Sequence, residues 1–292
     1  MNLLISIIAT TLSFATPITL GALSGLACER AGVVNIGIEG MMLAAAFGGF
    51  LAAVTTGNLL VAVLVAILVG TLMAALHAGL AITARVDQII SGTVINILGV
   101  GITSYLYGQL YARNAPNTPG TLPTVPIPGT NSSVQLLGLV AIGIVFVMHV
   151  VIKNTPWGLR VRAVGEHPKA ADTVGIDVRR VRYSAVLLGG GLAGLGGASF
   201  VPGYVPSFSP GMTAGYGFIA LAAMIFGKWR PFGAWFAALF FGFTLALQIT
   251  LQSYQVPIDS RLIGALPYLA TLIVLAGFVG RSTPPAADGV PY

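Results

Sequence analysis

Residues 58–83 read NLLVAVLVAILVGTLMAALHAGLAIT and contain no Asp, Glu, Lys or Arg. A helix of about 20 apolar residues crosses the hydrocarbon core of a bilayer, so this stretch predicts a membrane-spanning helix. Similar runs recur along the chain at approximately 3–26, 33–56, 58–83, 88–112, 134–152, 183–203, 211–226, 232–252 and 262–280. They lack the strict alternation of barrel strands. We therefore expect an all-α, polytopic transmembrane bundle of about nine spans, within a range of eight to ten.

The composition supports one transmembrane domain over residues 1–292. Of the 292 residues, 56% are hydrophobic and 8% are charged, whereas soluble domains carry about 25% charged residues. Such a chain lacks the polar side chains needed to coat a soluble domain. No basic region precedes the first apolar run, so we expect that segment to be retained in the mature protein. The single cysteine, Cys28, excludes an internal disulfide.

Two of the apolar runs are interrupted. The run 33–56 opens with a Gly-rich polar motif, and the run 211–226 is short for a complete span. Because glycine weakens a helix, we expect one or both of these segments to form a broken or re-entrant helix.

The basic residues predict the orientation. With the polar loop 153–182 in the cytoplasm, alternation of nine spans leaves only Arg113 and Arg261, of fourteen Lys and Arg residues, on the outer side. This bias matches the positive-inside rule. We therefore expect a bacterial inner-membrane protein with its N-terminus outside and its C-terminus in the cytoplasm. The net charge of +6 then reflects topology, and no nucleic-acid partner is expected.

The predicted outer loop, 113–133, is rich in proline, with Pro116, Pro119, Pro123, Pro126 and Pro128. This spacing favours an extended, semi-rigid path without helix. The loop is either a plain connector or a docking lip for a soluble partner.

Signatures of enzymes are missing from the sequence. There is no G-x-x-x-x-G-K-[ST] motif, and the nearest approach, Gly227-Lys228, is followed by Trp229. The three histidines are dispersed and none has a second ligand at metal spacing: His77, His149 and His167. We expect no catalytic residue, no metal site and no cofactor, and no hydrolysis of ATP by this chain.

The loop 153–182 contains signals of a short helix, at about 167–174. Pro168 suits the first turn, and Gly175 suits the C-terminal stop. A helix this short is unstable alone, so it needs a surface to bind. That surface is either a partner protein or, because the loop is basic, anionic membrane lipid. The residues alone favour neither.

The motif Asn35-Ile36-Gly37-Ile38-Glu39-Gly40 places a carboxylate within an apolar run. An ionisable group there is costly and is a functional candidate. Glu39 either contacts substrate or caps a broken helix through backbone N–H groups, and we favour the structural role for the motif residues Asn35, Gly37, Glu39 and Gly40. Asn96 lies mid-run and either bridges helices or lines a pathway.

At these motifs the chain resembles the permeases of the ribose/branched-chain amino acid type of ABC importers, most closely the nucleoside (simple-sugar-like) branch. Four stretches carry the resemblance: ERAGVVNIGIEGMML (29–43), DQIISGTVINIL (87–98), GLRVRAVGEHPKAADTVGI (158–176) and GYGFIALAAMIFGKWRPFG (215–233). The tail PPAADGVPY (284–292) is similar to the family ending except at Asp288.

The resemblance implies a set of partners. Permeases of this type pair with a second permease, here a longer paralogue in a heterodimer. They bind cytoplasmic ABC ATPase domains and receive substrate from an extracytoplasmic binding lipoprotein. The short loop helix then corresponds to a coupling helix that contacts the ATPase, through Gly165, Glu166, Pro168, Ala170, Ala171 and Gly175.

The resemblance also implies a nucleoside substrate, with simple sugars or branched-chain amino acids as alternatives. A nucleoside offers a ring face and hydroxyl groups, so aromatic and amide side chains suit its pathway. We take Asn96, Phe208 and Tyr216 as candidates of that kind.

Two other classes of protein remain as alternatives. An ion-coupled secondary transporter needs several membrane-buried carboxylates or histidines, and Glu39 is the one plausible candidate. A membrane-embedded enzyme needs a clustered catalytic set, which the dispersed histidines and Cys28 do not provide.

Overall fold

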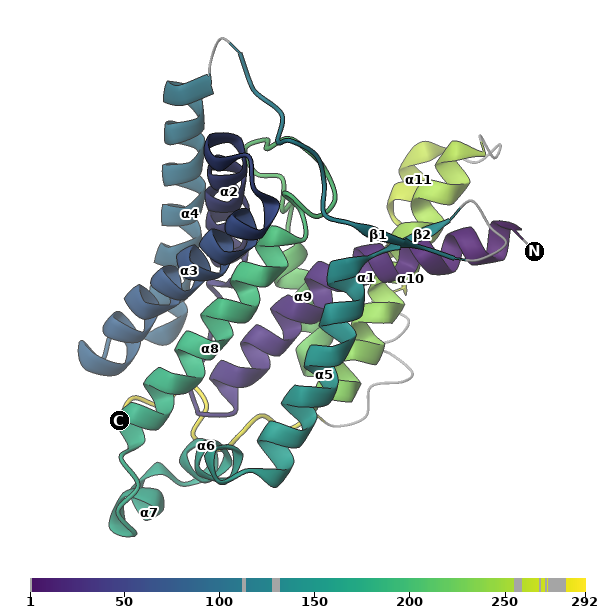
Figure 1. The fold of residues 1–292 in the computed structure, drawn as a ribbon. Coiled ribbons are helices and arrows are strands. Elements are labelled where there is room, and N and C mark those ends of the chain that lie inside the picture. Colours follow the sequence, from purple (N-terminus) through teal and green to yellow (C-terminus); the bar gives the residue numbers. More distant parts are fainter. Residues whose placement is uncertain are drawn as a thin grey trace.

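The computed structural model describes residues 2–111, 114–127, 132–254, 259–267, 269, 270, 272 and 282–292 (Figure 1). Most of these residues are helical. In chain order the elements are α1 (Asn2–Glu29), α2 (Ile38–Thr56), α3 (Leu59–Ala78), the π-helical turn η1 (Gly79–Thr83), α4 (Gln88–Tyr111), β1 (Thr124–Pro126), β2 (Ser133–Gln135), α5 (Leu136–Asn154), α6 (Pro156–Glu166), α7 (Pro168–Thr173), α8 (Val178–Ala198), α9 (Tyr216–Phe226), α10 (Pro231–Ser253) and α11 (Ser260–Gly264).

Within the described residues, six helices are long and apolar enough to cross a bilayer: α1, α2, α3 with η1, α4, α5 and α10. Helix α8 has a comparable length of 21 residues but carries three arginines in its first turns. Helix α9, with 11 residues, is too short to cross alone. The last predicted run, 262–280, lies largely outside the described residues. The polytopic helical fold is therefore confirmed, and the count of nine spans stays a prediction.

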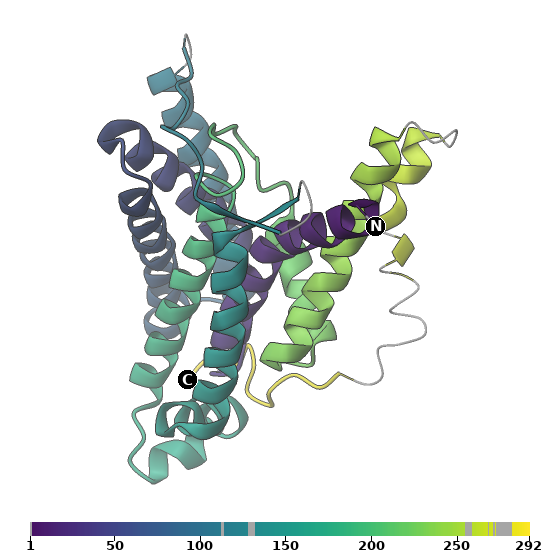
Figure 2. The same cartoon turned by 45° about the vertical axis from the view of Figure 1, so that its right-hand side comes forward.

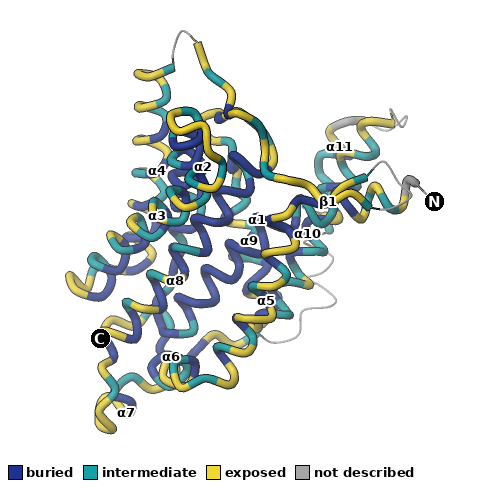
Figure 3. The backbone as a smooth tube through the Cα atoms, in the orientation of Figure 1, coloured by how far each residue is buried: buried dark blue, intermediate teal, exposed yellow. Residues whose placement is uncertain are grey.

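Helices α1, α2 and α8 form the centre of the bundle. Helix α8 packs against α1, α2 and α3, while α10 and α9 pack on α1, and α4 packs on α2. Buried residues follow α1, α2 and α8 through the interior (Figure 3). The Gly-rich stretch 189–197 of α8 packs against α1, α2 and α3, and a Cβ at Gly190 would collide with Ala74 of α3. These glycines therefore allow close helix packing.

Both interrupted runs contain irregular backbone. In the run 33–56, helix α2 begins only at Ile38, after the α1–α2 loop (residues 30–37). In the run 211–226, the helix covers only Tyr216–Phe226. The preceding residues, 199–215, form turns, with positive φ at Gly211 and Gly215. Irregular backbone at membrane depth requires other partners for its polar groups, and these partners define the candidate site below.

The described part of the Pro-rich loop is extended and contains no helix. Its strand β1 pairs with β2 in an antiparallel ladder, with Thr124 opposite Gln135. This small hairpin is a correction to the all-α expectation. The backbone N–H of Leu122 donates to the carbonyl oxygen of Pro202 at 3.0 Å, so the loop is attached to the irregular segment 199–215. Pro128 lies outside the described residues.

The basic residues gather at one end of the bundle, where α6, α7 and the C-terminus lie (Figure 1). Arg30 meets the α9–α10 turn there through a hydrogen bond to the Trp229 carbonyl oxygen. Arg261, in α11, lies at the opposite end, beside the N-terminal turns of α1 (Figures 1 and 2). Arg113 and Arg281 lie outside the described residues.

Candidate functional site

Side chains of α4 satisfy the polar backbone groups of the α1–α2 loop. Gln88 Oε1 accepts from the Val34 N–H at 2.6 Å. Asn96 Nδ2 donates to the Ile36 carbonyl oxygen at 3.0 Å, and its Oδ1 accepts from the Gly40 N–H at 2.8 Å. An unpaired backbone group in a membrane interior costs several kcal/mol. These two amides therefore replace hydrogen bonds that a continuous helix would have made.

The remaining residues of the motif also face inward. Asn35 is fully buried, and its Oδ1 accepts from the Gly37 N–H at 3.1 Å. Gly40 lies directly against α4, where an added Cβ would stand 2.5 Å from the carbonyl oxygen of Ile95. The motif thus occupies a tight joint between α2 and α4.

Glu39 reaches the start of α9. Its Oε1 accepts from Thr213 Oγ1 at 2.6 Å and from the Gly215 N–H at 2.9 Å. Its Oε2 accepts from the Gly217 N–H at 2.6 Å. The first N–H groups of a helix lack partners within the helix and favour a nearby anion. The Glu39 carboxylate, which belongs to α2, therefore caps the N-terminus of α9.

A second glutamate meets the other end of α9. Trp229 follows α9, and its indole Nε1 donates to Glu29 Oε2 at 2.7 Å. Both side chains are buried. The neighbouring Arg30 Nε donates to the Trp229 carbonyl oxygen at 2.9 Å. Sequence reasoning missed Glu29 and Trp229, although each stands beside a basic residue at the end of an apolar run.

The three pathway candidates do not share one location. Asn96 and Tyr216 lie on either side of Glu39 and Gly40 and are partly exposed. Phe208 is buried in an aromatic cluster, with ring centroids 5.1 Å from Phe47 and 5.4 Å from Tyr107. Asn96 and Tyr216 therefore lie near the same two residues of α2, and Phe208 occupies a packing position.

The loop 153–182 is folded into two helices, α6 and α7, which with the following turn we call the coupling segment (residues 156–176). Helix α7, with Pro168 in its first turn, is the expected short helix. Gly175 ends it with a φ of +82°, a conformation that favours glycine. Helix α6 was missed, although Thr155 and Pro156 are an N-cap pair and Thr155 Oγ1 accepts from the Gly158 N–H at 3.1 Å.

The coupling segment rests on a small apolar cluster. Ala171 of α7 is buried there with Val161 and Val164 of α6. Gly165 lies against the α1–α2 loop, because a Cβ at this position would collide with the carbonyl oxygen of Arg30. Of the predicted coupling residues, Gly165 and Ala171 therefore face inward, Pro168 is half-buried, and three are exposed: Glu166, Ala170 and Gly175.

An open groove of about 420 Å³ runs between α6 and α7. Its apolar wall includes Leu159 and Val174, which are 60% and 73% exposed. Sequence reasoning did not select these two residues. An exposed apolar side chain within a basic polar loop is the signal that would have identified them.

The C-terminal tail is bound to the coupling segment. The Ala287 N–H donates to the Gly165 carbonyl oxygen at 2.8 Å, and Glu166 Oε2 accepts from the Ala286 N–H at 3.2 Å. Arg182 Nη1 donates to the Val290 carbonyl oxygen at 2.9 Å. Burial raises the pKa of the Asp288 carboxyl to about 6. The tail therefore joins α6, α8 and the α1–α2 loop.

No group of three His, Cys, Asp or Glu side chains that could hold a metal ion occurs in the described part of the chain. The arrangement has three features. Helix α9 is hydrogen-bonded at both ends, polar contacts join α2 to α4, and α6 and α7 form an exposed groove.

Comparison with known proteins matches residues 7–275 to a family described as branched-chain amino acid transport system / permease component. The guanosine ABC transporter permease protein NupQ of Bacillus subtilis is 39% identical over 100% of this chain and 98% of its own length. The nucleoside ABC transporter permease protein NupC of Lactococcus lactis is 37% identical over the same shares. A putative glucose ABC transporter permease protein of Haloferax volcanii, TsgC13, is 34% identical over 97% of this chain and 94% of its own length. This chain therefore belongs to the branched-chain amino acid transport system / permease component family.

Proposed function

We propose that this chain is the membrane-spanning permease subunit of an ATP-driven importer of nucleosides. The observation that carries the proposal is its near full-length similarity to permeases named for guanosine and nucleosides. In this role the chain supplies the substrate pathway and transmits movement from the ATPase, and it carries out no covalent chemistry. Partner ATPase subunits bind and hydrolyse the ATP.

The coupling segment is the proposed contact with the ATPase. Helix α7, with six residues, is too short to be stable alone. It is held from one side by the apolar cluster around Ala171, and its outer side presents Ala170 and Val174 to solvent. A protein that fills the α6–α7 groove would bury both residues and could push on the α1–α2 loop through Gly165.

The orientation follows from the same assignment. The coupling segment and the surrounding basic residues would face the cytoplasm of a bacterial cell, as the positive-inside rule favours. The N-terminus and the β1–β2 hairpin would face outward. The hairpin would then meet an extracytoplasmic binding lipoprotein, and the exposed leucines of α3 would contact lipid or a second, longer permease.

The pathway would pass the joint between α2, α4 and α9. Tyr216, partly exposed beside Phe200, offers a ring that suits the face of a base. Asn96 offers an amide, but both of its polar groups already bind backbone, at the Gly40 N–H of α2 and the Ile36 carbonyl oxygen of the α1–α2 loop. Contact between Asn96 and substrate therefore requires a second conformation of this joint. Alternation between two such states fits a transport cycle.

Simple sugars are the second candidate substrate class, because one relative is named as a putative glucose permease. Uptake of labelled guanosine and labelled glucose by cells with and without this chain separates the two. Loss of guanosine uptake alone is expected. Loss of glucose uptake alone would replace nucleosides with sugars, and gradient-driven transport by proteoliposomes of this chain alone would exclude an ATP-driven importer.

Docking of the ATPase is tested by Glu166→Arg and Gly175→Leu in the assembled transporter. Both variants are expected to insert into the membrane and to lose substrate-stimulated ATP hydrolysis. Thr55→Arg, at the exposed end of α2, is the control and should retain it. Retention of ATPase co-purification and of stimulated hydrolysis in both coupling variants would show that this segment is not the docking site.

A further inference from the structure

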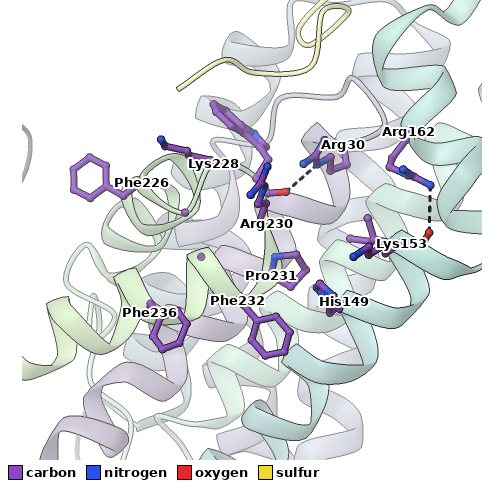
Figure 4. A pocket seen from close by; sticks show the side chains of 14 residues that line it. Arg30, His149, Lys153, Arg162, Phe226, Lys228, Arg230, Pro231, Phe232 and Phe236 are labelled. Atoms are coloured by element: carbon purple, nitrogen blue, oxygen red, sulfur yellow. Dashed lines mark hydrogen bonds between the residues drawn. The ribbon is translucent and has the colours of Figure 1, made fainter. Parts of the chain in front are cut away.

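A cavity of about 790 Å³ opens where α5, α6 and the α9–α10 turn meet. Five basic side chains line it: Arg30, Lys153, Arg162, Lys228 and Arg230. They come from four different elements (Figure 4). A cavity of this size is within the range of sites for small organic molecules.

The positive charge in this cavity is not neutralised by ion pairs. Arg180 and Asp177 form the single ion pair found among the described residues, and it lies outside the cavity. Lys153, Lys228 and Arg230 are exposed. Burial lowers the pKa of Arg30, Glu166 raises it, and the nearby Arg162 and Arg230 lower it further. None of the described residues that line the cavity is Asp or Glu, so the cavity retains an excess of cations.

The rest of the lining is apolar and aromatic. Phe232 of α10 packs edge-on against Phe146 of α5, with ring centroids 5.0 Å apart, and lies 4.8 Å from the ring of His149. Phe236 lines the cavity one turn further along α10 and is 62% exposed. Cationic and apolar groups therefore occupy the same cavity.

The cationic and aromatic side chains of the cavity lie at different depths along α5 and α10. Helix α5 leaves the bilayer through Phe146, His149 and then Lys153. Helix α10 enters it through Arg230, Phe232 and then Phe236. In both helices the cation lies at the loop end and the aromatic rings lie deeper in the span. An amphiphile with an anionic head and apolar chains has the same polarity along the same axis.

We propose that this cavity binds an anionic glycerophospholipid, with its phosphate among the five basic side chains and its acyl chains along Phe232 and Phe236. A soluble anion could use the cations but would leave the aromatic half empty. In the orientation proposed above, the lipid comes from the cytoplasmic leaflet. Such a lipid would bridge α5 and α10 beside the coupling segment.

Native mass spectrometry of the delipidated full-length chain, titrated with phosphatidylglycerol or phosphatidylcholine, tests the proposal. The test variant combines Lys153→Gln, Lys228→Gln and Arg230→Gln, which are exposed and leave the hydrogen-bonded Arg30 and Arg162 intact. Each basic group near an anionic lipid contributes roughly 1 kcal/mol, so affinity for phosphatidylglycerol should fall by at least about tenfold. The matched control removes three other basic residues of the same end: Arg160→Gln, Arg179→Gln and Arg180→Gln.

Two further measurements distinguish a lipid from a soluble anion as the ligand. They are the affinity of Phe236→Ser for phosphatidylglycerol and the competition of inorganic phosphate with that lipid. Weaker phosphatidylglycerol binding by this exposed variant, with little competition from phosphate, is the expected result. Equal loss of binding in the test and control triples would overturn the site. So would equal binding of phosphatidylcholine, or displacement of the lipid by phosphate at equal concentration, which would identify a soluble anion as the ligand.

Discussion

The α1–α2 loop and the coupling segment lie in contact, yet their contacts are of different kinds. The loop is fixed by side chains of α4, and the Glu39 carboxylate that follows it accepts three hydrogen bonds. The coupling segment rests on a small apolar cluster and the C-terminal tail, and much of its surface is exposed. Regions with few buried contacts open at lower free energy. In the proposed transport cycle, force would enter through the coupling segment and pass to a joint that resists local deformation.

The largest effect on stability is expected at the joint. Gly40→Val places a branched side chain against the carbonyl oxygen of Ile95, and overpacking of this kind costs about 3 kcal/mol. The thermal midpoint of the purified protein should fall sharply. Gly101→Val is the control, because an added Cβ at Gly101 meets nothing within 4 Å. Equal thermal midpoints for the two variants would show that Gly40 is not closely packed against α4.

A smaller loss is expected from Glu39→Gln. The amide keeps the shape of the side chain but loses the charge-assisted hydrogen bonds to Thr213, Gly215 and Gly217. The free energy of unfolding should fall by about 2 kcal/mol. Thr213→Val, which removes one donor, should cost less. An unchanged unfolding curve for Glu39→Gln would show that α9 does not depend on this cap.

The tail that links the two regions should respond to pH. The pKa of Asp288 is raised from 3.8 to about 6 in the docked state, so the docked tail binds a proton more tightly than a free tail. Its contribution is therefore fully present below pH 3.8 and is lost as the pH rises through about 6.

Proteolytic release of the tail should accordingly be slower below pH 6 than above it. Asp288→Asn should remove this dependence and protect the tail at neutral pH. A release rate that changes with pH equally in the wild type and in Asp288→Asn would assign the effect to another group.

The smallest effect on stability is expected at the exposed end of the coupling segment. Val174 is 73% exposed, so Val174→Asp should change the free energy of unfolding by less than about 0.5 kcal/mol. The same variant should lower ATP-driven uptake strongly if the α6–α7 groove receives the ATPase. Thr55→Asp, at the exposed end of α2, is the matched control. Full uptake by Val174→Asp would remove this residue from the proposed contact.

Periodicity and hydrophobic length predicted most of the fold, because a membrane helix must satisfy its backbone internally and must be long enough to cross. The short helix α7 was predictable from Pro168 and Gly175, whose backbone preferences are local. Helix α6 has an equally local signal in Thr155 and Pro156. The β1–β2 pairing depends on contacts with the segment 199–215 and has no comparable local signal.

The candidate site was less predictable because its contacts join distant segments. Glu39 was identifiable as a costly carboxylate in an apolar run, but its partners lie more than 170 residues away in sequence. Phe208 was selected for its chemistry alone, and its burial against Phe47 shows that its ring serves packing. The C-terminal tail has no periodicity, so its contact with Gly165 could not be inferred.

The carboxylates of Glu29 and Glu39 accept hydrogen bonds at opposite ends of the 11-residue helix α9. Helix α9 cannot shift along its own axis without breaking the hydrogen bonds at one of its ends. It must therefore move together with α1 and α2. Spectroscopic labels placed on α9 and α2 would therefore keep a constant separation throughout a transport cycle. Labels that are to follow the movement should instead bridge α9 and α5, across the basic cavity.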